Sequence, residues 1–274
     1  RTSDWSRNWE RKVSGASLGL ILCSYPLISG IVQQQAQKGT VATYQQMINN
    51  SSNSSLEEAL SKAKEYNEVL FESLTSLSSD KLSILSEENY NATLDIGNGI
   101  MGSIEIPSIN VNLPIYHGTS DEVLSAGVGH LNGSSLPIGG VNTKSILTAH
   151  RGLPSSKLFT RLDELVEGDL FFIRVLNETL AYKVNDIQVI EPEDVAGLEI
   201  EEGKDLVSLI TCTPYGLNTH RLVVTGERTE YEPAIYESIE SKNMSIREYV
   251  FLAIPFVFLT IIVGRRINSA RKKA

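Results

Sequence analysis

Residues 208–222 read SLITCTPYGLNTHRL, a stretch with the form of two strands joined by a turn. An apolar run ends at Cys212, a Pro-Tyr-Gly-Leu-Asn connection follows, and a second apolar run begins after Arg221. Short apolar runs separated by Pro and Gly predict an antiparallel hairpin. Because the last residue of one strand lies beside the first residue of the next, the hairpin places the Arg221 guanidinium next to the Cys212 thiol.

Short β-rich runs of the same kind fill the chain from about residue 100 onward. They cover residues 102–106, 111–116, 145–149, 170–176, 180–190, 206–211 and 222–225. Seven or eight such strands in about 130 residues predict a closed barrel or a sandwich.

The segment before these strands has a helical composition from residue 33 to about residue 77. An Asn- and Ser-rich stretch at 49–55 interrupts it, and Ser55-Leu-Glu-Glu58 has the form of a capping box that opens a second helix. The second helix carries an apolar stripe at helical spacing: Leu56, Leu60, Ala63, Tyr66, Leu70 and Leu74. We expect a helical hairpin packed on the main domain, followed by a polar, loop-like segment at 78–98.

Two uncharged apolar segments, 13–32 and 249–264, have lengths near that needed to cross a bilayer. Basic residues precede the first segment and follow the second, which predicts that both termini are cytoplasmic and that the section between them is extracellular. For the first segment a cleaved signal peptide is the alternative to an uncleaved anchor; its long apolar stretch favours the anchor.

The section between the two basic ends is strongly acidic, with 15 basic and 31 acidic residues. This charge excludes nucleic acid as an expected partner. Of the two cysteines, Cys23 lies inside the first apolar segment, so Cys212 has no partner for a disulfide. A thiol kept unpaired outside a cell favours a reactive role, and the alternative is a buried structural cysteine beside a surface arginine.

A cysteine nucleophile also needs a proton donor for the leaving amine, usually a histidine. His150 ends the apolar strand at 145–149 and leads into a loop, as Cys212 does, and is therefore the predicted base. His220 adjoins Arg221, and strand alternation sends the two to opposite faces. His117 lies in a loop-like stretch, and His130 is equally consistent with a structural histidine. The chain contains no phosphate-binding loop, HExxH motif or paired metal-ligand spacing, so neither a cofactor nor a metal is predicted.

The stretch SLITCTPYGLNTHRLVVTGER resembles the signature of the sortases, in which a Thr-Leu-x-Thr-Cys strand end is followed by a catalytic arginine. Residues 127–140, 147–154 and 158–163 (GVGHLNGSSLPIGG, LTAHRGLP and LFTRLD) resemble the class C sortases in particular, the pilus-assembly enzymes of Gram-positive bacteria. The resemblance implies an eight-stranded β-barrel. It also implies that Cys212 is the nucleophile, His150 the general acid/base and Arg221 the stabiliser of the oxyanion or substrate.

The same resemblance implies a transpeptidase that cleaves an LPxTG-like sorting signal and joins pilin subunits through lysine isopeptide bonds. Its partners would be pilins or surface proteins that carry this signal. Class C enzymes commonly carry a lid with an Asp-Pro-aromatic motif, but no proline of this chain follows an aspartate. The alternatives are a sortase that anchors proteins to the cell wall, a membrane-anchored cysteine protease and a non-catalytic assembly scaffold.

The predicted organisation is mainly β, with N-terminal helices and two flanking transmembrane helices. Its parts are a cytoplasmic tail at 1–12, a span at 13–32, a helical region and lid equivalent at 33–99, the barrel at 100–230, a linker at 231–248, a span at 249–264 and a basic tail at 265–274.

Overall fold

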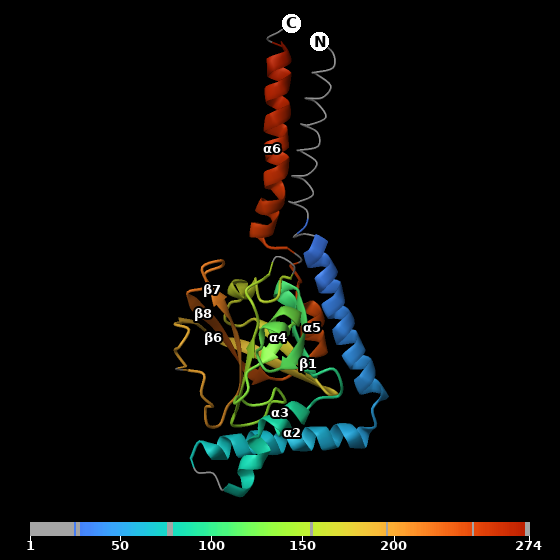
Figure 1. Cartoon of the computed structure of the whole chain (residues 1–274), viewed down its shortest axis with the longest axis vertical. Helices are drawn as coiled ribbons and strands as arrows, with labels where there is room; N and C mark the ends of the chain where they lie inside the picture. Colours follow the sequence, from blue (N-terminus) through green and yellow to red (C-terminus); the bar gives the residue numbers. More distant parts are fainter. Residues whose placement is uncertain are drawn as a thin grey trace.

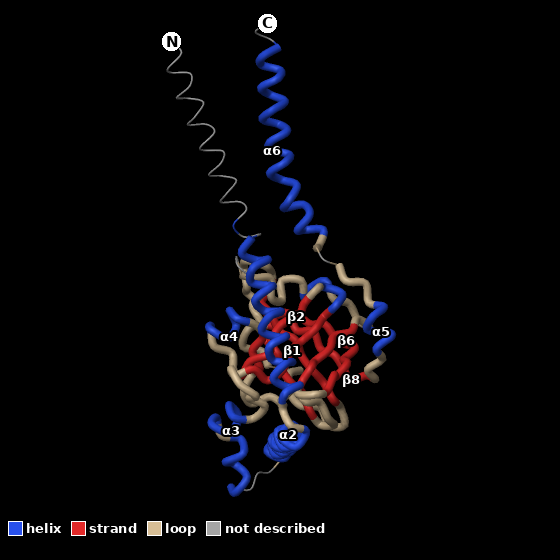
Figure 2. Tube along the Cα trace, turned by 90° about the vertical axis from the view of Figure 1, so that its right-hand side faces the viewer, coloured by secondary structure: helices blue, strands red, loops and turns tan. Residues whose placement is uncertain are grey.

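The structure, a computed structural model, describes residue 25 and residues 28–75, 79–153, 156–195, 197–242 and 244–271. Eight strands close into a barrel in the order β1-β2-β3-β4-β7-β8-β6-β5 (Figures 1 and 2). Their bounds are β1 (Ile100–Ile106), β2 (Val111–His117), β3 (Val128–His130), β4 (Thr143–Thr148), β5 (Leu170–Val175), β6 (Glu178–Ile190), β7 (Asp205–Thr213) and β8 (His220–Thr229). The predicted barrel is confirmed, and the sandwich alternative is wrong.

Strand β3 is the element that the sequence pattern missed. It is only three residues long and completely buried, so it shows no alternation of apolar and polar residues. It nevertheless closes the barrel, because it pairs in parallel with β2 and antiparallel with β4. Helical turns connect some of the strands: η2 (Pro107–Ile109), α4 (Asp121–Ala126) and η3 (Leu162–Glu164). The short helix α5 (Pro233–Ser238) follows β8.

Two helices precede the barrel, one over residues 28–50 and α2 (Asn53–Ser73). The first lies along the side of the barrel and α2 lies across one of its ends (Figures 1 and 2), so they do not form the expected hairpin. The buried Tyr44 hydroxyl donates to the carbonyl of Met101 and accepts from the amide of Leu176, which fixes the first helix to the barrel.

Helix α2 begins at a different cap from the predicted one. The N-cap is Ser52, whose hydroxyl accepts from the amide of Ser55, because a hydroxyl caps best two or three residues before the amide that it satisfies. Most of the predicted apolar stripe is buried against the barrel, but Leu74 is exposed. Asn67 is also buried, and its amide group bonds both the carbonyl and the amide of Leu136.

The segment at 79–98 is not the loop that its polar composition predicted. It contains η1 (Ser79–Leu85) and α3 (Glu87–Ala92), and α3 is capped by Ser86. Tyr90 and Leu94 are almost completely buried. Ile84, Leu85 and Ile96 also pack against the core, so a few apolar anchors order a segment that is otherwise mostly polar.

Helix α6 (Ile246–Arg271) extends away from the barrel at the end opposite to α2 (Figure 1). The predicted span at 13–32 lies almost entirely outside the described residues, as does Cys23. Within the part of the chain that is described, no helix combines the length and apolarity needed to cross a bilayer, and neither predicted span is confirmed.

Candidate active site

Cys212 and Arg221 are direct cross-strand neighbours in the β7–β8 hairpin. Residues that pair in this way project from the same face of a sheet, with their Cβ atoms about 5 Å apart. Both side chains are half-buried, so each remains partly open to solvent. The hairpin expected from the sequence is therefore present, with Cys212 and Arg221 paired across it.

His150 follows β4, the strand that flanks β7 on the side opposite to β8. Strand β4 runs parallel to β7, with Thr148 level with Ile210. The backbone pairing continues past the end of β4, where the amide of Ala149 donates to the Ile210 carbonyl at 3.1 Å. Two residues further along each strand, His150 is level with Cys212 on the same face.

Cys212 thus lies on the central one of three neighbouring strands, between His150 on the β4 side and Arg221 on the β8 side. Adjacent strands are separated by about 4.8 Å, a spacing that side chains bridge easily. The arrangement brings together a candidate nucleophile, a candidate proton carrier and a cation. This is the set of groups that covalent acyl transfer requires.

The chain turns sharply after this histidine. Gly152 has φ +92°, in the region that favours glycine, and a Cβ atom there would collide with the side chain of Thr160. The turn leaves His150 half-exposed and sends the next side chain, Arg151, into the protein interior. The Thr211 hydroxyl donates to the Ala149 carbonyl at 2.8 Å and ties the loop to β7.

The other three histidines lie elsewhere. His220 is exposed, pairs with Thr213 and points away from the face that carries Arg221, as strand alternation predicted. Both ring nitrogens of His117 face backbone carbonyls, those of Gly99 and Thr93. His117 and His130 pair at the ends of β2 and β3.

His130 is the structural histidine that the sequence left open. Its Nε2 donates to the Ser135 carbonyl at 2.8 Å, so Nδ1 of the neutral ring accepts from the Tyr90 hydroxyl at 2.9 Å. Burial lowers the pKa of His130 from 6.5 to about 4, and the Ser135 bond opposes this only in part. The neutral imidazole is fully hydrogen-bonded, which suits a buried position.

We expect the protein to lose stability in mild acid because of His130. Between pH 6.5 and about pH 4 the unfolded chain binds a proton at this residue and the folded protein does not. The free energy of unfolding should therefore decrease as the pH is lowered through this range, by up to about 3 kcal/mol. Urea unfolding of the wild type and of His130→Gln across this range measures it. The variant should show a shallower pH dependence, and equal slopes in the two proteins would contradict the assignment.

Segment 79–98 contains α3, which lies beside α2 at the end of the barrel away from α6 (Figure 1). The Tyr90 hydroxyl contacts the end of β3 and the amide of Gly118 just after β2. His130 pairs with Leu147 of β4, and Leu147 is level with Leu209 of β7. Leu94 is buried in the hydrophobic core and Ile96 packs against that core, so neither side chain is free to act as a lid.

A small thiol reagent should label Cys212 readily in the folded protein. The thiol is half-exposed and has no disulfide partner among the described residues. In a Cys23→Ser background, we expect methanethiosulfonate to react with the folded chain at least as fast as with the urea-unfolded chain. Mass spectrometry of timed samples gives both rates. Slow labelling of the folded chain alone would show that another segment covers the thiol.

The sequence reasoning missed Arg151 and Asp163, which form a buried ion pair behind the candidate site. The position of Arg151 next to His150 was the only available signal, and it does not reveal the partner. Among the described residues, no group of three or more His, Cys, Asp or Glu is placed to hold a metal ion.

Comparison with known proteins agrees with this geometry. Residues 104–229 match the sortase domain family. The structure is similar to that of sortase C1 from Streptococcus agalactiae, with a TM-score of 0.65 and 45% identity, covering 70% of this chain and 99% of that one. It is also similar to sortase C from Clostridium perfringens with the C-terminal cell wall sorting motif, with a TM-score of 0.60 and 43% identity, over 70% of this chain and 99% of that one.

The likeness extends to sequence alone, because Sortase A from Streptococcus agalactiae is 29% identical over 185 residues, which is 64% of this chain and 72% of that protein. The domain match covers nearly the whole barrel, and almost the full length of the two solved sortases C is matched at more than 40% identity. The chain belongs to the sortase family of transpeptidases, and its close structural neighbours are class C sortases.

Proposed function

We propose that this sortase is a class C enzyme that cleaves an LPxTG-like sorting signal and joins pilin subunits through lysine isopeptide bonds. The proposal places the barrel at the cell surface, where pilins or other surface proteins that carry the signal are its substrates. The observation that carries it is the arrangement of three residues. Cys212, a free cysteine, is the cross-strand neighbour of Arg221, and His150 is level with Cys212 on the strand at the other side. The class C assignment is supported by the similarity to the two sortases C.

In the first half-reaction, the Cys212 thiolate attacks the carbonyl carbon of the Thr–Gly bond in the sorting signal. The electrons of the carbonyl move onto its oxygen, and the resulting oxyanion lies within reach of the Arg221 guanidinium. His150 in its protonated form gives a proton to the leaving glycine amine. The C–N bond breaks, and the pilin is held as a thioester on Cys212.

In the second half-reaction, a lysine amine of another subunit attacks the thioester carbonyl. His150, now neutral, accepts the proton that the attacking amine loses. The C–S bond breaks, Cys212 leaves as a thiolate, and the two subunits are joined by an amide. The two steps are redox-neutral and return the histidine to its starting state.

The Arg221 guanidinium has N–H donors left for this role. Its Nη1 donates to the backbone carbonyls of Asn218 and His220 at 3.4 Å and 3.2 Å. No carboxylate in the described part of the chain forms an ion pair with it. The planar guanidinium can therefore direct two parallel N–H bonds at a developing oxyanion or at a peptide carbonyl.

Arg221→Lys should lower turnover by about a hundredfold or more. Lysine keeps the positive charge but replaces the rigid fork by a flexible ammonium, so one directed donor is lost. The loss should fall mainly on kcat, because the oxyanion exists only along the reaction path. Steady-state cleavage of a fluorogenic sorting-signal peptide measures it, and near-normal kcat in the lysine variant would show that charge alone is needed.

The proposed function itself is tested by incubating the full-length chain with candidate pilins and looking for covalent ladders on denaturing gels. Ladders linked through lysine support pilin polymerisation. Transfer to a cell-wall peptide amine without ladders would assign the enzyme to wall anchoring. Cleavage with water as the only acceptor would make it a protease. A scaffold would show no covalent product, and its assembly function would survive Cys212→Ala.

A further inference from the structure

Arg151 joins the two halves of the proposed site. It directly follows His150, and it is buried, with 7% of the residue exposed. Its Nη1 donates to the backbone carbonyl of Cys212 at 3.3 Å and to the hydroxyl of Thr213. The Arg151 guanidinium therefore connects the end of β7, which carries Cys212, to the loop after β4, which carries His150.

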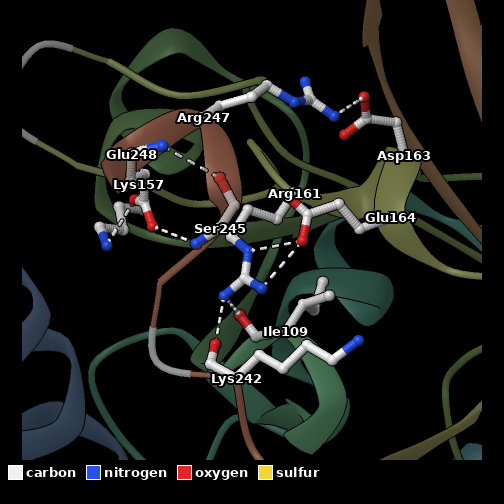
Figure 3. Close-up of polar contacts among 9 residues, drawn as sticks. All are labelled: Ile109, Lys157, Arg161, Asp163, Glu164, Lys242, Ser245, Arg247 and Glu248. Carbon is white, nitrogen blue, oxygen red and sulfur yellow. Dashed lines mark hydrogen bonds and ion pairs between the residues drawn. The ribbon is translucent and has the colours of Figure 1, made fainter. Parts of the chain in front are cut away.

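The other end of this guanidinium is held by Asp163, at the start of the turn η3. Nη2 of Arg151 lies 2.7 Å from Oδ2 of Asp163. The same Oδ2 lies 2.7 Å from Nη2 of Arg247, in the first turn of α6 (Figure 3). Asp163 thus links the base of the C-terminal helix to the residue that holds the Cys212 strand end.

The base of α6 is seated on the same loop by further polar contacts (Figure 3). Lys157 pairs with Glu248 at 2.6 Å, and Glu248 accepts from the amide of Ser245 at the helix N-terminus. The buried Arg161 pairs with Glu164 and also donates to the Lys242 carbonyl in the segment leading to the helix. Several independent contacts therefore fix this loop against the helix.

The Arg151–Asp163 pair is not arranged for maximal stability. Nε of Arg151 and Oδ1 of Asp163 are both buried and have no hydrogen-bond partner in the described part of the chain. Buried charges are costly to desolvate, and a pair with orphaned atoms recovers less of that free energy than a fully bonded one. A role in positioning explains the pair better than a role in stability does.

We propose that Arg151 and Asp163 are positioning residues for Cys212, and that Arg247 couples the base of the C-terminal helix to them. Through its bonds to Cys212 and Thr213, Arg151 sets the distance and orientation of the thiol relative to His150. Asp163 keeps the guanidinium in that orientation. This inference rests on the proposed function, because it assumes that Cys212 and His150 react together.

The chain contains a matched control for this pair. Arg161 and Glu164 form a second arginine–carboxylate pair on the same loop, at 2.9 Å, and the side-chain exposures of both pairs are 6% for the arginine and 23% for the carboxylate. The Arg161 side chain bonds the carbonyls of Ile109 and Lys242, not the Cys212 strand end. The two pairs therefore have equal burial and differ in what they hold.

The test compares Asp163→Asn with Glu164→Gln in the full-length chain. Both variants should lower Tm to a similar extent, since each leaves a buried guanidinium without its counter-ion. Asp163→Asn should in addition lower kcat for the sorting-signal peptide by on the order of a hundredfold with little change in KM, because small displacements of reacting groups have effects of this size. Asp163→Glu should recover part of kcat. Equal kcat in the Asn and Gln variants would overturn the proposal.

A second experiment tests the coupling between the base of α6 and Asp163 without changing a buried charge. Arg247 has 58% of its side chain exposed, so Arg247→Ala should fold normally. We expect it to lower kcat by about threefold to tenfold, whereas Lys157→Ala, which breaks the other ion pair of the helix base, should leave kcat unchanged. Equal effects of the two alanine variants, or no effect of either, would overturn the coupling through Asp163. Cys212→Ala in the same assay separates this result from the proposed function, since activity of that variant would contradict the proposed mechanism whatever the effect of Arg247→Ala.

Discussion

Replacing Cys212 by alanine should abolish both the cleavage of a sorting signal and the joining of subunits, with turnover reduced by on the order of 10⁴-fold or more. Without the thiol no acyl-enzyme can form, and the oxyanion-stabilising arginine has no attacking group to assist. No other thiol in the described part of the chain can take its place. Cys23 lies inside the predicted N-terminal span and would therefore be within the bilayer.

The alanine variant should fold as the wild type does. Cys212 is half-exposed, so the loss of one sulfur atom removes little buried surface. Thermal unfolding gives the folding control, and trapping of a thioester intermediate by mass spectrometry gives the direct readout. Retained subunit joining by the folded alanine variant would disprove the nucleophile and, with it, the mechanism.

Replacing His150 by alanine should be nearly as damaging, with turnover lowered by roughly 10²- to 10⁴-fold. The leaving amine must be protonated when the acyl-enzyme forms, and the acceptor lysine must lose a proton when it breaks down. The other three histidines are not arranged to substitute. His220 projects to the opposite face of β8, and both ring nitrogens of His117 and of His130 are already hydrogen-bonded elsewhere.

The matched control is His220→Ala, whose side chain is exposed and faces away from Arg221. We expect its turnover to be within about twofold of wild type, as for a surface substitution outside the site. His130→Ala is unsuitable as a control because it would leave the Ser135 carbonyl and the Tyr90 hydroxyl without their partner. An active His150→Ala together with an inactive, folded His220→Ala would show that the wrong histidine was chosen.

The pairing of Cys212 with Arg221 could be predicted because it is local. The two residues belong to one hairpin, and strand alternation together with a short connection decides which side chains meet. The same kind of reasoning placed the apolar stripe of α2, from Leu56 to Leu70, against the barrel. Short-range periodicity carries this information because it reflects which residues are buried.

Other features could not be predicted because tertiary contacts override local preference. β3 is three buried residues that become a strand only between β2 and β4. The polar segment at 79–98 is ordered by Tyr90 and Leu94, whose partners lie in the barrel. The cap of α2 moved from Ser55 to Ser52 within a run of Asn and Ser in which several residues can serve.

By itself, the sequence determined that the fold is built mainly of short β-strands and that a hairpin pairs Cys212 with Arg221. The closed barrel was implied by the resemblance to sortases. The tertiary structure decided that His150 lies level with Cys212, since this depends on the parallel pairing of β4 with β7, two strands about 60 residues apart in the chain. It also decided that Arg151 and Asp163 lie behind the site and connect it to the C-terminal helix. The physical reason is that parallel pairing and buried ion pairs join residues distant in sequence, and neither leaves a periodic pattern in the chain.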